Sequence, residues 1–477
     1  MTEEFTLKGE WFLPSSRDIR IHGTLLYHPN EGANLELYGS LDAENFFPVF
    51  QDQEIILGLS SDSRQVVLYN CHMTKSGGAT LVQGEESGKP SVSYSIRYII
   101  IGLHINHADE LKFDRISCEI FNLGEWVGIS GFINHPLDVE KFKRNEIIVE
   151  YKLPDPIIFQ IDKNTSGRFN FIANHPGLSR YQKSINITQR VAFQADTKTE
   201  NSIDDLLKYV ISFQNFLILA LYRSTYPLAI TLSGERHKKD YGDGKLVRKN
   251  VKLFFSTTNF KKTDEPKLDY DMLFDYRRVR DKFPSLIKNW FSKYELLEPA
   301  FNLVFEQFYN GNRFTENTFL NLAQSAETFH ARTNNHTKIH KEDYKFMKDE
   351  ILKLTPEKYH GWLKDQFNFG NNLNLHARLT EITEKYSNDI LDKILGDKKR
   401  FVLNVKYSRN YYTHYSSDGK KKALKGLDLF YLSEKLKILL ICSFLMEIGF
   451  QKEELTASLE NVKWRLFNHL ANWKEEK

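Results

Sequence analysis

A chain of 477 residues is longer than a single hydrophobic core usually supports, so two or three domains are expected. Its 41% hydrophobic and 27% charged residues are those of an ordinary soluble globular protein, and the net charge of +3 is too small by itself to indicate a class of partner. Three cysteines far apart in sequence (Cys71, Cys118 and Cys442) argue against a disulfide framework and for a reducing compartment, and the lack of a CxxC pair argues against a zinc ribbon.

Neither a signal peptide nor a membrane span is expected. The first residues, Met1-Thr2-Glu3-Glu4, are acidic and contain no apolar core. The most apolar stretches, 210–221 and 438–446, are shorter than the ~20 residues that cross a bilayer. We therefore expect a cytoplasmic protein without a membrane partner.

The first ~200 residues predict strands separated by turns. Residues 20–25 and 34–41 alternate between apolar and polar side chains, as half-buried strands do. Further β-like runs are 54–59, 65–70, 92–105 and 146–153, and turn signals such as Gly77-Gly78 and His135-Pro136 interrupt them. Short strands at this spacing predict an antiparallel sandwich or barrel, taken here as a sandwich-like domain over residues 1–200.

Residues 201–285 are expected to complete that domain or to link it to the next. Ser202-Ile203-Asp204-Asp205 resembles a capping box, so a helix should begin there and run to about Tyr222. Residues 228–232 follow as a strand, and Asp243-Gly244 indicates a hairpin turn.

Residues 286–477 are expected to form an all-α bundle. Apolar side chains recur at helical spacing, and Gly311, Pro356 and Gly370 mark breaks between helices. The recurring positions are Phe319, Leu322, Ala323, Ala326, Phe329 and His330, then Leu375, Leu379, Ile382, Tyr386 and Ile390, then Leu432, Leu436, Leu439 and Leu440. The predicted fold class is therefore α+β multidomain, with an antiparallel β-rich domain followed by a helical bundle.

The stretch Arg409-Asn410-Tyr411-Tyr412-Thr413-His414 carries the strongest chemical signal. Histidine titrates near neutrality and can move a proton to or from a hydroxyl group. Arginine stays charged and can hold a phosphate through two parallel hydrogen bonds. A metal-independent ribonuclease needs both side chains, although from spacing alone an exposed helix end that carries an ordinary histidine is the favoured interpretation.

The charge around this motif is strongly basic. Residues 397–425 contain nine Lys or Arg against Asp397 and Asp418, a charge of +7, which leaves −4 for the rest of the chain. Such a patch attracts a polyanion. A solvated loop is the alternative, and residues 416–420 have the composition of one.

The helical segment resembles a HEPN domain, specifically the ApeA-like branch of that superfamily. The resemblance rests on residues 320–327 of an early helix, on a long central helix, and on Arg409-Asn410 followed by His414. The first half resembles the domain that accompanies this HEPN domain in ApeA anti-phage proteins. The residues that carry this second resemblance are Gly9, Trp11, Pro14, Gly23-Thr24-Leu25, Leu35-Glu36-Leu37, Gly39, Gly102, His104, Phe113 and Trp126.

The resemblance implies an RNA endonuclease that acts in abortive defence against phage. HEPN ribonucleases work without metal and as dimers, with the Arg–His motifs of two protomers facing one another. The catalytic residues carried over are Arg409, Asn410 and His414, with no cofactor and no metal. The implied partners are RNA, with tRNA among the candidates, a second copy of the chain in a homodimer or higher homo-oligomer, and a phage-derived trigger sensed by the N-terminal domain.

Elementary geometry agrees with a dimer. Positions five apart on a helix point ~140° from one another, so Arg409 does not stand above His414, whereas Asn410 and His414 share a face. RNA cleavage by internal attack needs one group to deprotonate the 2′-hydroxyl and another to protonate the leaving 5′-oxygen. One histidine cannot do both at once, and a two-fold dimer supplies two. Tyr411 and Tyr412 can stack on bases, but burial of at least one of them in the core or in the dimer interface is the favoured interpretation.

Other constellations are weaker. His336 and His340 are four apart, as in some zinc sites, and His330 is near, but residue 337 is threonine where HExxH has glutamate, so no metal is expected. In domains that this segment resembles, a glutamate such as Glu327 could contact the arginine, but an ordinary surface glutamate is at least as compatible with the sequence, so Glu327 is left out of the site. No GxxxxGK[ST] or GxSxG motif occurs. The alternative function is a non-catalytic HEPN-type module for dimerisation or for binding a nucleotide or a partner.

Overall fold

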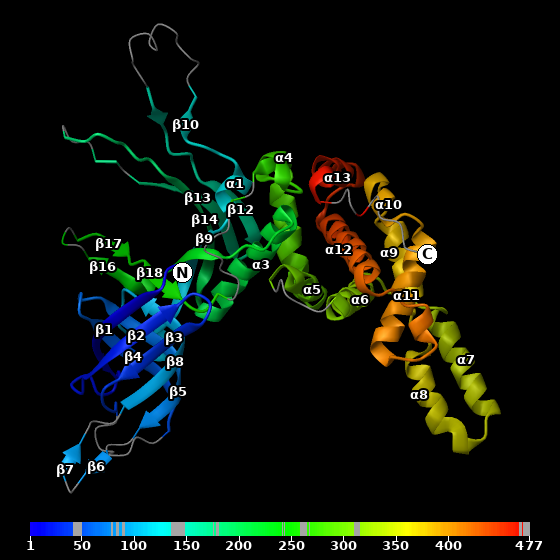
Figure 1. The fold of residues 1–477 in the computed structure, drawn as a ribbon, viewed down its shortest axis with the longest axis horizontal. Coiled ribbons are helices and arrows are strands. Elements are labelled where there is room, and N and C mark those ends of the chain that lie inside the picture. Colours follow the sequence, from blue (N-terminus) through cyan, green and yellow to red (C-terminus); the bar gives the residue numbers. More distant parts are fainter. Residues whose placement is uncertain are drawn as a thin grey trace. The chain divides into compact units, whose positions relative to one another are not determined.

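The computed structural model describes residues 1–41, 50–77, 80–82, 85–87, 91–134, 148–174, 176–177, 181–240, 242, 244–257, 265–266, 268–309, 315–466 and 470. The chain divides into two compact units, Met1–Lys288 and Asn289–Lys477. Antiparallel strands dominate the first unit and helices the second, as Figure 1 shows, which confirms the predicted α+β multidomain fold class. In the described ranges no helix combines the length and the apolar character that crossing a membrane requires.

One twelve-stranded antiparallel sheet forms the framework of the first unit. The strands in chain order are β1 (Phe5–Phe12), β2 (Ile21–His28), β3 (Gly32–Leu37), β4 (Gln53–Ser60), β5 (Gln65–Gly77), β6 (Thr80–Val82), β7 (Glu85–Ser87), β8 (Ser91–Ile101), β9 (Lys112–Ile120), β10 (Phe132–Ile133), β11 (Glu150–Tyr151), β12 (Ile157–Asp162), β13 (Thr165–Ala173), β14 (Gln189–Ser202), β15 (Pro227–Ser233), β16 (Lys238–Asp240), β17 (Leu246–Arg248) and β18 (Val251–Phe254). The order in the sheet is β12-β13-β14-β9-β15-β18-β8-β3-β2-β1-β4-β5.

An additional pairing between β5 and β8 closes six of these strands into a barrel, in the order β8-β3-β2-β1-β4-β5 and back to β8. One edge of β8 pairs with β5 along its length. The other edge pairs with β3 through residues 92–96 and with β18 through residues 99–101. The other six strands of the sheet therefore extend from β8 as an open sheet. Of the two arrangements that the strand spacing predicted, a sandwich or a barrel, the structure has the barrel, with a sheet extension in place of the sandwich-like domain.

Alternating side chains fill the barrel. Along β2 and β3 the inward residues Leu25, Tyr27, Leu35 and Leu37 are buried, as their period of two predicts. Trp11 is fully buried and lies opposite Gly58, where a Cβ atom would stand 2.3 Å from the indole ring.

Three of the predicted strands are shorter than expected, and of the one expected over 146–153 the described residues contain only β11 (Glu150–Tyr151). The strand expected over 34–41 ends at Leu37, and the one expected over 92–105 ends at Ile101. Gly39 (φ +153°) and Gly102 (φ +121°) follow these ends with a backbone conformation that strands do not continue.

Helix α3 (Ile203–Leu221) begins as its capping box predicts, because the Ser202 hydroxyl accepts a hydrogen bond from the Asp205 N–H at 3.1 Å. It packs on β9 and β14, with Phe213 stacked on Phe193 at a ring separation of 4.3 Å. The other short helices of this unit are η1 (Ala108–Glu110), α1 (Leu123–Val127), η2 (Glu235–His237), η3 (Asp269–Asp271) and α4 (Tyr276–Val279). Strands β16 and β17 pair on either side of the predicted hairpin turn.

Several predicted turn residues lie outside the described residues, namely Gly78, His135, Pro136, Asp243 and Gly311.

The helices that build the second unit are α5 (Phe283–Tyr309), α6 (Thr315–Thr333), α7 (Lys341–Leu354), η4 (Glu357–Tyr359), α8 (His360–Gly370), α9 (Leu375–Lys385), α10 (Asp389–Leu395), α11 (Lys398–His414), η5 (Gly419–Lys421), α12 (Gly426–Ile448) and α13 (Lys452–Leu466). α12 is buried along most of its length and contacts α6, α10 and α11. α9 contacts both α6 and α11. The periodic stretch 375–390 is two helices, because the Asn388 side chain accepts a hydrogen bond from the Leu391 N–H and begins α10.

Helices α7 and α8 form a hairpin that lies beside the bundle in Figure 1. The Tyr344 hydroxyl donates a hydrogen bond to the carbonyl of Phe367 at 2.9 Å, which links the two helices. None of their residues is buried, and Leu354 is 87% exposed. The hairpin is therefore held to the unit mainly through its base.

Candidate functional site

Helix α11 carries the Arg–His motif, and its sequence explains how it is placed. Its first turn is capped by the Asp397 side chain, which accepts a hydrogen bond from the Arg400 N–H at 3.1 Å. The face that packs on α6, α9 and α12 is formed by Phe401, Val402, Val405, Ser408 and Tyr412. Burying this face leaves the opposite face of the helix in solvent.

Asn410 and His414 occupy the exposed face. Both side chains are exposed, and they are four residues apart, so they stand one above the other. His414 is the last residue of α11, since Tyr415 adopts a left-handed conformation (φ 49°) and ends it. Within the described part of the chain neither side chain forms a hydrogen bond or an ion pair. The two groups are therefore open to a substrate or to a second protomer.

Arg409 forms an ion pair with Glu327 of α6. Its Nη2 atom lies 3.1 Å from Oε2 and 3.4 Å from Oε1 of that carboxylate, and both side chains are about one-third exposed. Among the described residues its other guanidinium nitrogens have no partner. Glu327 was not among the predicted site residues, because in the sequence it is identifiable only as a glutamate on a predicted helix. The pair fixes the direction of the guanidinium beside α11.

The three predicted site residues do not converge within one chain. With ~100° between successive residues, Arg409 points to one flank of the exposed face and Tyr411 to the other. His414 lies between these flanks. The angle between Arg409 and His414 around the helix agrees with the ~140° expected from spacing. One copy of α11 therefore presents an arginine and a histidine that do not point toward the same place.

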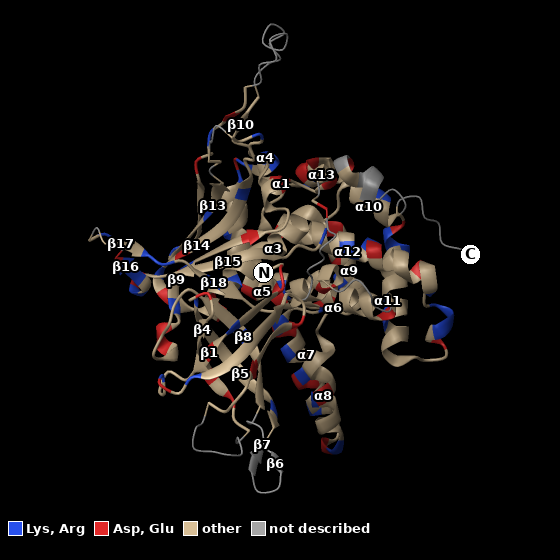
Figure 2. Ribbon diagram, turned by 60° about the vertical axis from the view of Figure 1, so that its left-hand side comes forward, with Lys and Arg blue, Asp and Glu red and all other residues tan. Residues whose placement is uncertain are grey.

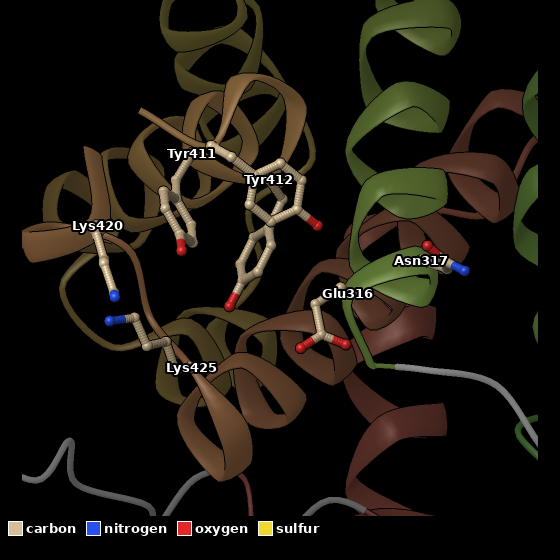
Figure 3. Close-up of a pocket in the computed structure, with 7 residues that line it drawn as sticks. Glu316, Asn317, Tyr411, Tyr412, Lys420 and Lys425 are labelled. Atoms are coloured by element: carbon tan, nitrogen blue, oxygen red, sulfur yellow. The ribbon is translucent and has the colours of Figure 1, made fainter. Parts of the chain in front are cut away.

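A surface pocket of about 540 Å³ opens on the tyrosine flank, and Figure 3 shows the side chains around it. It is lined by Glu316, Asn317, Tyr411, Tyr412, Tyr415, Lys420 and Lys425. The residues come from the start of α6, the end of α11 and the turn that leads to α12. Apart from the tyrosines of the motif, none of them was singled out from the sequence as a site residue.

The rings of this pocket are held in place by one another and by the backbone. Tyr412 is buried, and its hydroxyl donates a hydrogen bond to the carbonyl of Leu424 at 3.0 Å. Burial raises the pKa of Tyr412 to about 12, so the ring stays neutral. The Tyr411 ring lies 5.0 Å from Tyr412 and 5.5 Å from Tyr415, and the Lys425 ammonium lies 6.0 Å from the Tyr411 ring. Aromatic faces beside lysines suit a base and its phosphate.

Several of the basic residues predicted from the sequence lie near this flank, among them Lys420 and Lys425 in the pocket itself. Lys406 and Lys422 both stand over the Tyr407 ring, at 5.6 and 5.2 Å. Figure 2 shows lysine and arginine (blue) on the turn beside α11. Four of the nine predicted cations thus lie in the turn after His414, and three lie in the first turn of α11 (Lys398, Lys399 and Arg400).

The histidines considered as metal ligands are arranged differently from the prediction. His336 and His340 are not on a helix, because α7 begins only at Lys341. His336 instead lies beside His330 and Glu381, with the Glu381 carboxylate 2.8 Å from a ring nitrogen of each histidine. This group is separate from the Arg409–His414 motif, although His330 is one helical turn from Glu327 on α6.

Comparison with protein-family models identifies both halves of the chain. The model of ApeA N-terminal domain 1 matches residues 6–290, which is more than half of the chain, and the model of Apea-like HEPN matches residues 320–454. No curated protein and no solved structure matches. The second match contains α11 with its motif, and HEPN domains are generally nucleases that bind RNA and dimerise. Both matches confirm the resemblance found in the sequence: the chain belongs to the ApeA family of HEPN-type anti-phage defence proteins.

Proposed function

We propose that the helical unit is a metal-independent endoribonuclease whose active site is formed by the α11 helices of two protomers. The observation that carries the proposal is the exposed face of α11, where Asn410 and His414 stand between an ion-paired arginine and a pocket of tyrosines and lysines. An RNA strand lying across this face would meet a phosphate-binding cation, a proton-transfer group and a stacking surface in that order.

Cleavage would proceed by attack of the 2′-hydroxyl on the adjacent phosphorus. His414 of one protomer removes the proton of the 2′-hydroxyl, and the His414 side chain of the second protomer protonates the leaving 5′-oxygen. The products are a 2′,3′-cyclic phosphate and a 5′-hydroxyl. DNA, which lacks the 2′-hydroxyl, is not a substrate of this route.

Arg409 supports the same step electrostatically. Glu327 contacts only Nη2 of its guanidinium, so Nη1 and Nε remain available to the phosphate among the described groups. Loss of a donor that stabilises charge in a transition state costs roughly 3–4 kcal/mol, or ~10²–10³ in rate. Asn410, one turn before His414, can donate to a phosphate oxygen or orient the imidazole.

In the cell this activity would serve abortive defence. We propose that the β-rich unit recognises a phage-derived trigger and restrains the nuclease until infection, and that the RNA substrate is tRNA or another cellular RNA. The family assignment supports the defence role, and the barrel with its sheet extension offers a large surface for such a trigger.

The test is cleavage of total cellular RNA by the purified protein with EDTA present, followed by analysis of the fragment ends. Wild type is expected to leave 2′,3′-cyclic phosphate ends, and His414→Ala and Arg409→Ala are expected to be inactive. His340→Ala, which removes an exposed histidine elsewhere in the same unit, is the matched control and should be fully active. Extract from infected cells is added in a second series to supply the trigger.

Two outcomes contradict the proposal. Cleavage that survives His414→Ala assigns the chemistry to other residues. A dimeric protein that cuts no RNA with or without infected-cell extract supports the alternative, a non-catalytic module whose tyrosine pocket binds a nucleotide or a partner.

A further inference from the structure

We propose that His330, His336 and Glu381 form a binding site for one divalent transition-metal ion of the Zn²⁺ type, which fastens the base of the α7–α8 hairpin to the helical bundle. The site is structural and lies outside the Arg409–His414 motif, so it is independent of the proposed nuclease chemistry.

The three side chains converge on one point. His330 Nε2 and His336 Nδ1 each lie 2.8 Å from the same carboxylate oxygen, Oε2 of Glu381, and the three atoms are within 4.8 Å of one another. They come from three different segments: the last turns of α6, the loop that follows it, and α9. His330 is only 2% exposed, whereas His336 is 63% exposed. One fixed ligand and one accessible ligand allow an ion to enter from solvent.

The donor set selects the class of metal. Two imidazole nitrogens and one carboxylate oxygen are ligands that Zn²⁺ uses, with water completing a tetrahedral shell, while Mg²⁺ and Ca²⁺ prefer sites made of oxygen. Zn–N bonds of about 2.0–2.1 Å place neighbouring ligand atoms about 3.3 Å apart in a tetrahedron. The observed 2.8 Å separations need to open by about 0.5 Å, which the exposed His336 and the partly exposed Glu381 side chains permit.

The surroundings leave room for the positive charge. Arg378, the neighbouring cation on α9, directs its guanidinium to backbone carbonyls, that of Leu373 at 2.8 Å and that of Glu327 at 3.0 Å. The carboxylate of Glu381 therefore keeps the two histidines as its hydrogen-bonding partners among the described residues. An ion that replaces these two hydrogen bonds binds all three side chains at once.

The location of the site indicates which part of the structure a bound ion would stabilise. His336 stands directly before the paired segments at the base of the hairpin, where Thr337 bridges Asn372 and the Ile339 N–H donates to the Asn371 side chain at 2.8 Å. Beyond this base α7 and α8 bury none of their residues. A metal ion that joins His336 to α6 and α9 therefore adds a strong attachment at the place where the hairpin depends on a few hydrogen bonds.

The sequence indicated only part of this site, since His330 and His336 were considered together with His340 and Glu381 was not. The two histidines are six residues apart and the glutamate follows 45 residues after the second, which fits no local ligand motif. The expectation of no metal rested on the pair His336 and His340, and His340 is not one of the ligands.

The experiment is a titration of the full-length protein, freed of metal with EDTA, by Zn²⁺ and in parallel by Mg²⁺ in a calorimeter. Wild type and His340→Ala should bind one Zn²⁺ ion per chain at this site and show no response to Mg²⁺. In His336→Ala the affinity of that site for Zn²⁺ should fall by more than the ~10–100-fold that is lost when a residue hydrogen-bonded to a metal ligand is removed. His336 is exposed and lies in a loop, so its replacement leaves the fold intact.

A second measurement separates a built site from adventitious binding. Hydrogen exchange of residues 334–374 should slow on addition of Zn²⁺ in wild type and in His340→Ala, but not in His336→Ala. Equal Zn²⁺ binding by wild type and His336→Ala, or Zn²⁺ binding without added protection of the hairpin, would overturn the proposal. Either result is independent of whether the protein cuts RNA.

Discussion

Glu447, on α12, offers a quantitative test of how the helical unit is held together. Its carboxylate accepts hydrogen bonds from Lys293 of α5 at 2.9 Å and from Lys385 and Tyr386 at the end of α9 at 2.9 and 2.6 Å. Burial opposes the charge, but these hydrogen bonds outweigh it and lower the pKa of Glu447 from 4.5 to about 2. One side chain thus joins three helices of the unit.

The size of the effect follows from the pKa. At about 1.4 kcal/mol per pKa unit, and reduced for its partial exposure, the charged form contributes about 2–3 kcal/mol to the free energy of unfolding. Because the pKa is lower in the folded state, this contribution is complete above pH 4.5 and is lost as the pH falls toward 2. We expect Glu447→Gln to destabilise the unit by about 2–3 kcal/mol at pH 7 and by about 1 kcal/mol at pH 3.

The assay must report on the helical unit alone. Hydrogen exchange of peptides from α9 and α12, measured along a urea series at pH 7 and at pH 3, gives the free energy of opening for those helices in both proteins. A difference between wild type and variant that is the same at the two pH values would refute the reasoning, since it would show that the carboxylate charge is not what stabilises the three-helix junction.

Three further predictions concern the proposed site and the barrel. Lys425→Ala should weaken RNA binding several-fold and lower the slope of log affinity against log salt by about 0.7–1, measured by fluorescence anisotropy, whereas the control Lys399→Ala on the first turn of α11 should leave binding nearly unchanged. An equal mixture of wild type and His414→Ala, allowed to exchange subunits, should cleave at about one quarter of the rate of the same total amount of wild type if two histidines act together, and at about half if each protomer acts alone. Gly58→Ala should lower the thermal midpoint by several degrees in calorimetry, because the new methyl group would overlap the buried Trp11 ring and cost about 1–3 kcal/mol.

The sequence predicted those parts of the fold that depend on local pattern. Period two along β2 and β3, the β-like runs at β4 and β5, and the capping box at Ser202 each indicated the correct element, because burial of side chains and satisfaction of a helix end are local requirements. Strand β1 was not predicted, although it carries Trp11 at the centre of the barrel. The sequence also did not indicate which strands close the barrel, since the pairing of β5 with β8 depends on the whole fold and has no sequence motif.

The same limit applies to the candidate site. Arg409, Asn410 and His414 are adjacent in sequence and could be selected together, but their catalytic role stays a prediction. Glu327 lies 82 residues before Arg409, and only the packing of α6 against α11 makes them partners. Lys420 and Lys425 of the tyrosine pocket were indicated only as members of the basic window, and Glu316 and Asn317 of α6 were missed for the same reason as Glu327.

The double pairing of β8 has a consequence for how the protein is made. Its edge at residues 99–101 pairs with β18, which lies about 150 residues later in the chain. At a synthesis rate of ~5–20 residues per second, that edge stays unpaired for ~8–30 s. An unpaired edge of this kind is an aggregation hazard for the nascent chain, and a chaperone that covers it would raise the yield of folded protein. Once β18 has emerged the sheet is complete, while the residues of α11 are still about 150 positions from synthesis. The unit proposed to restrain the nuclease can therefore exist before the nuclease does.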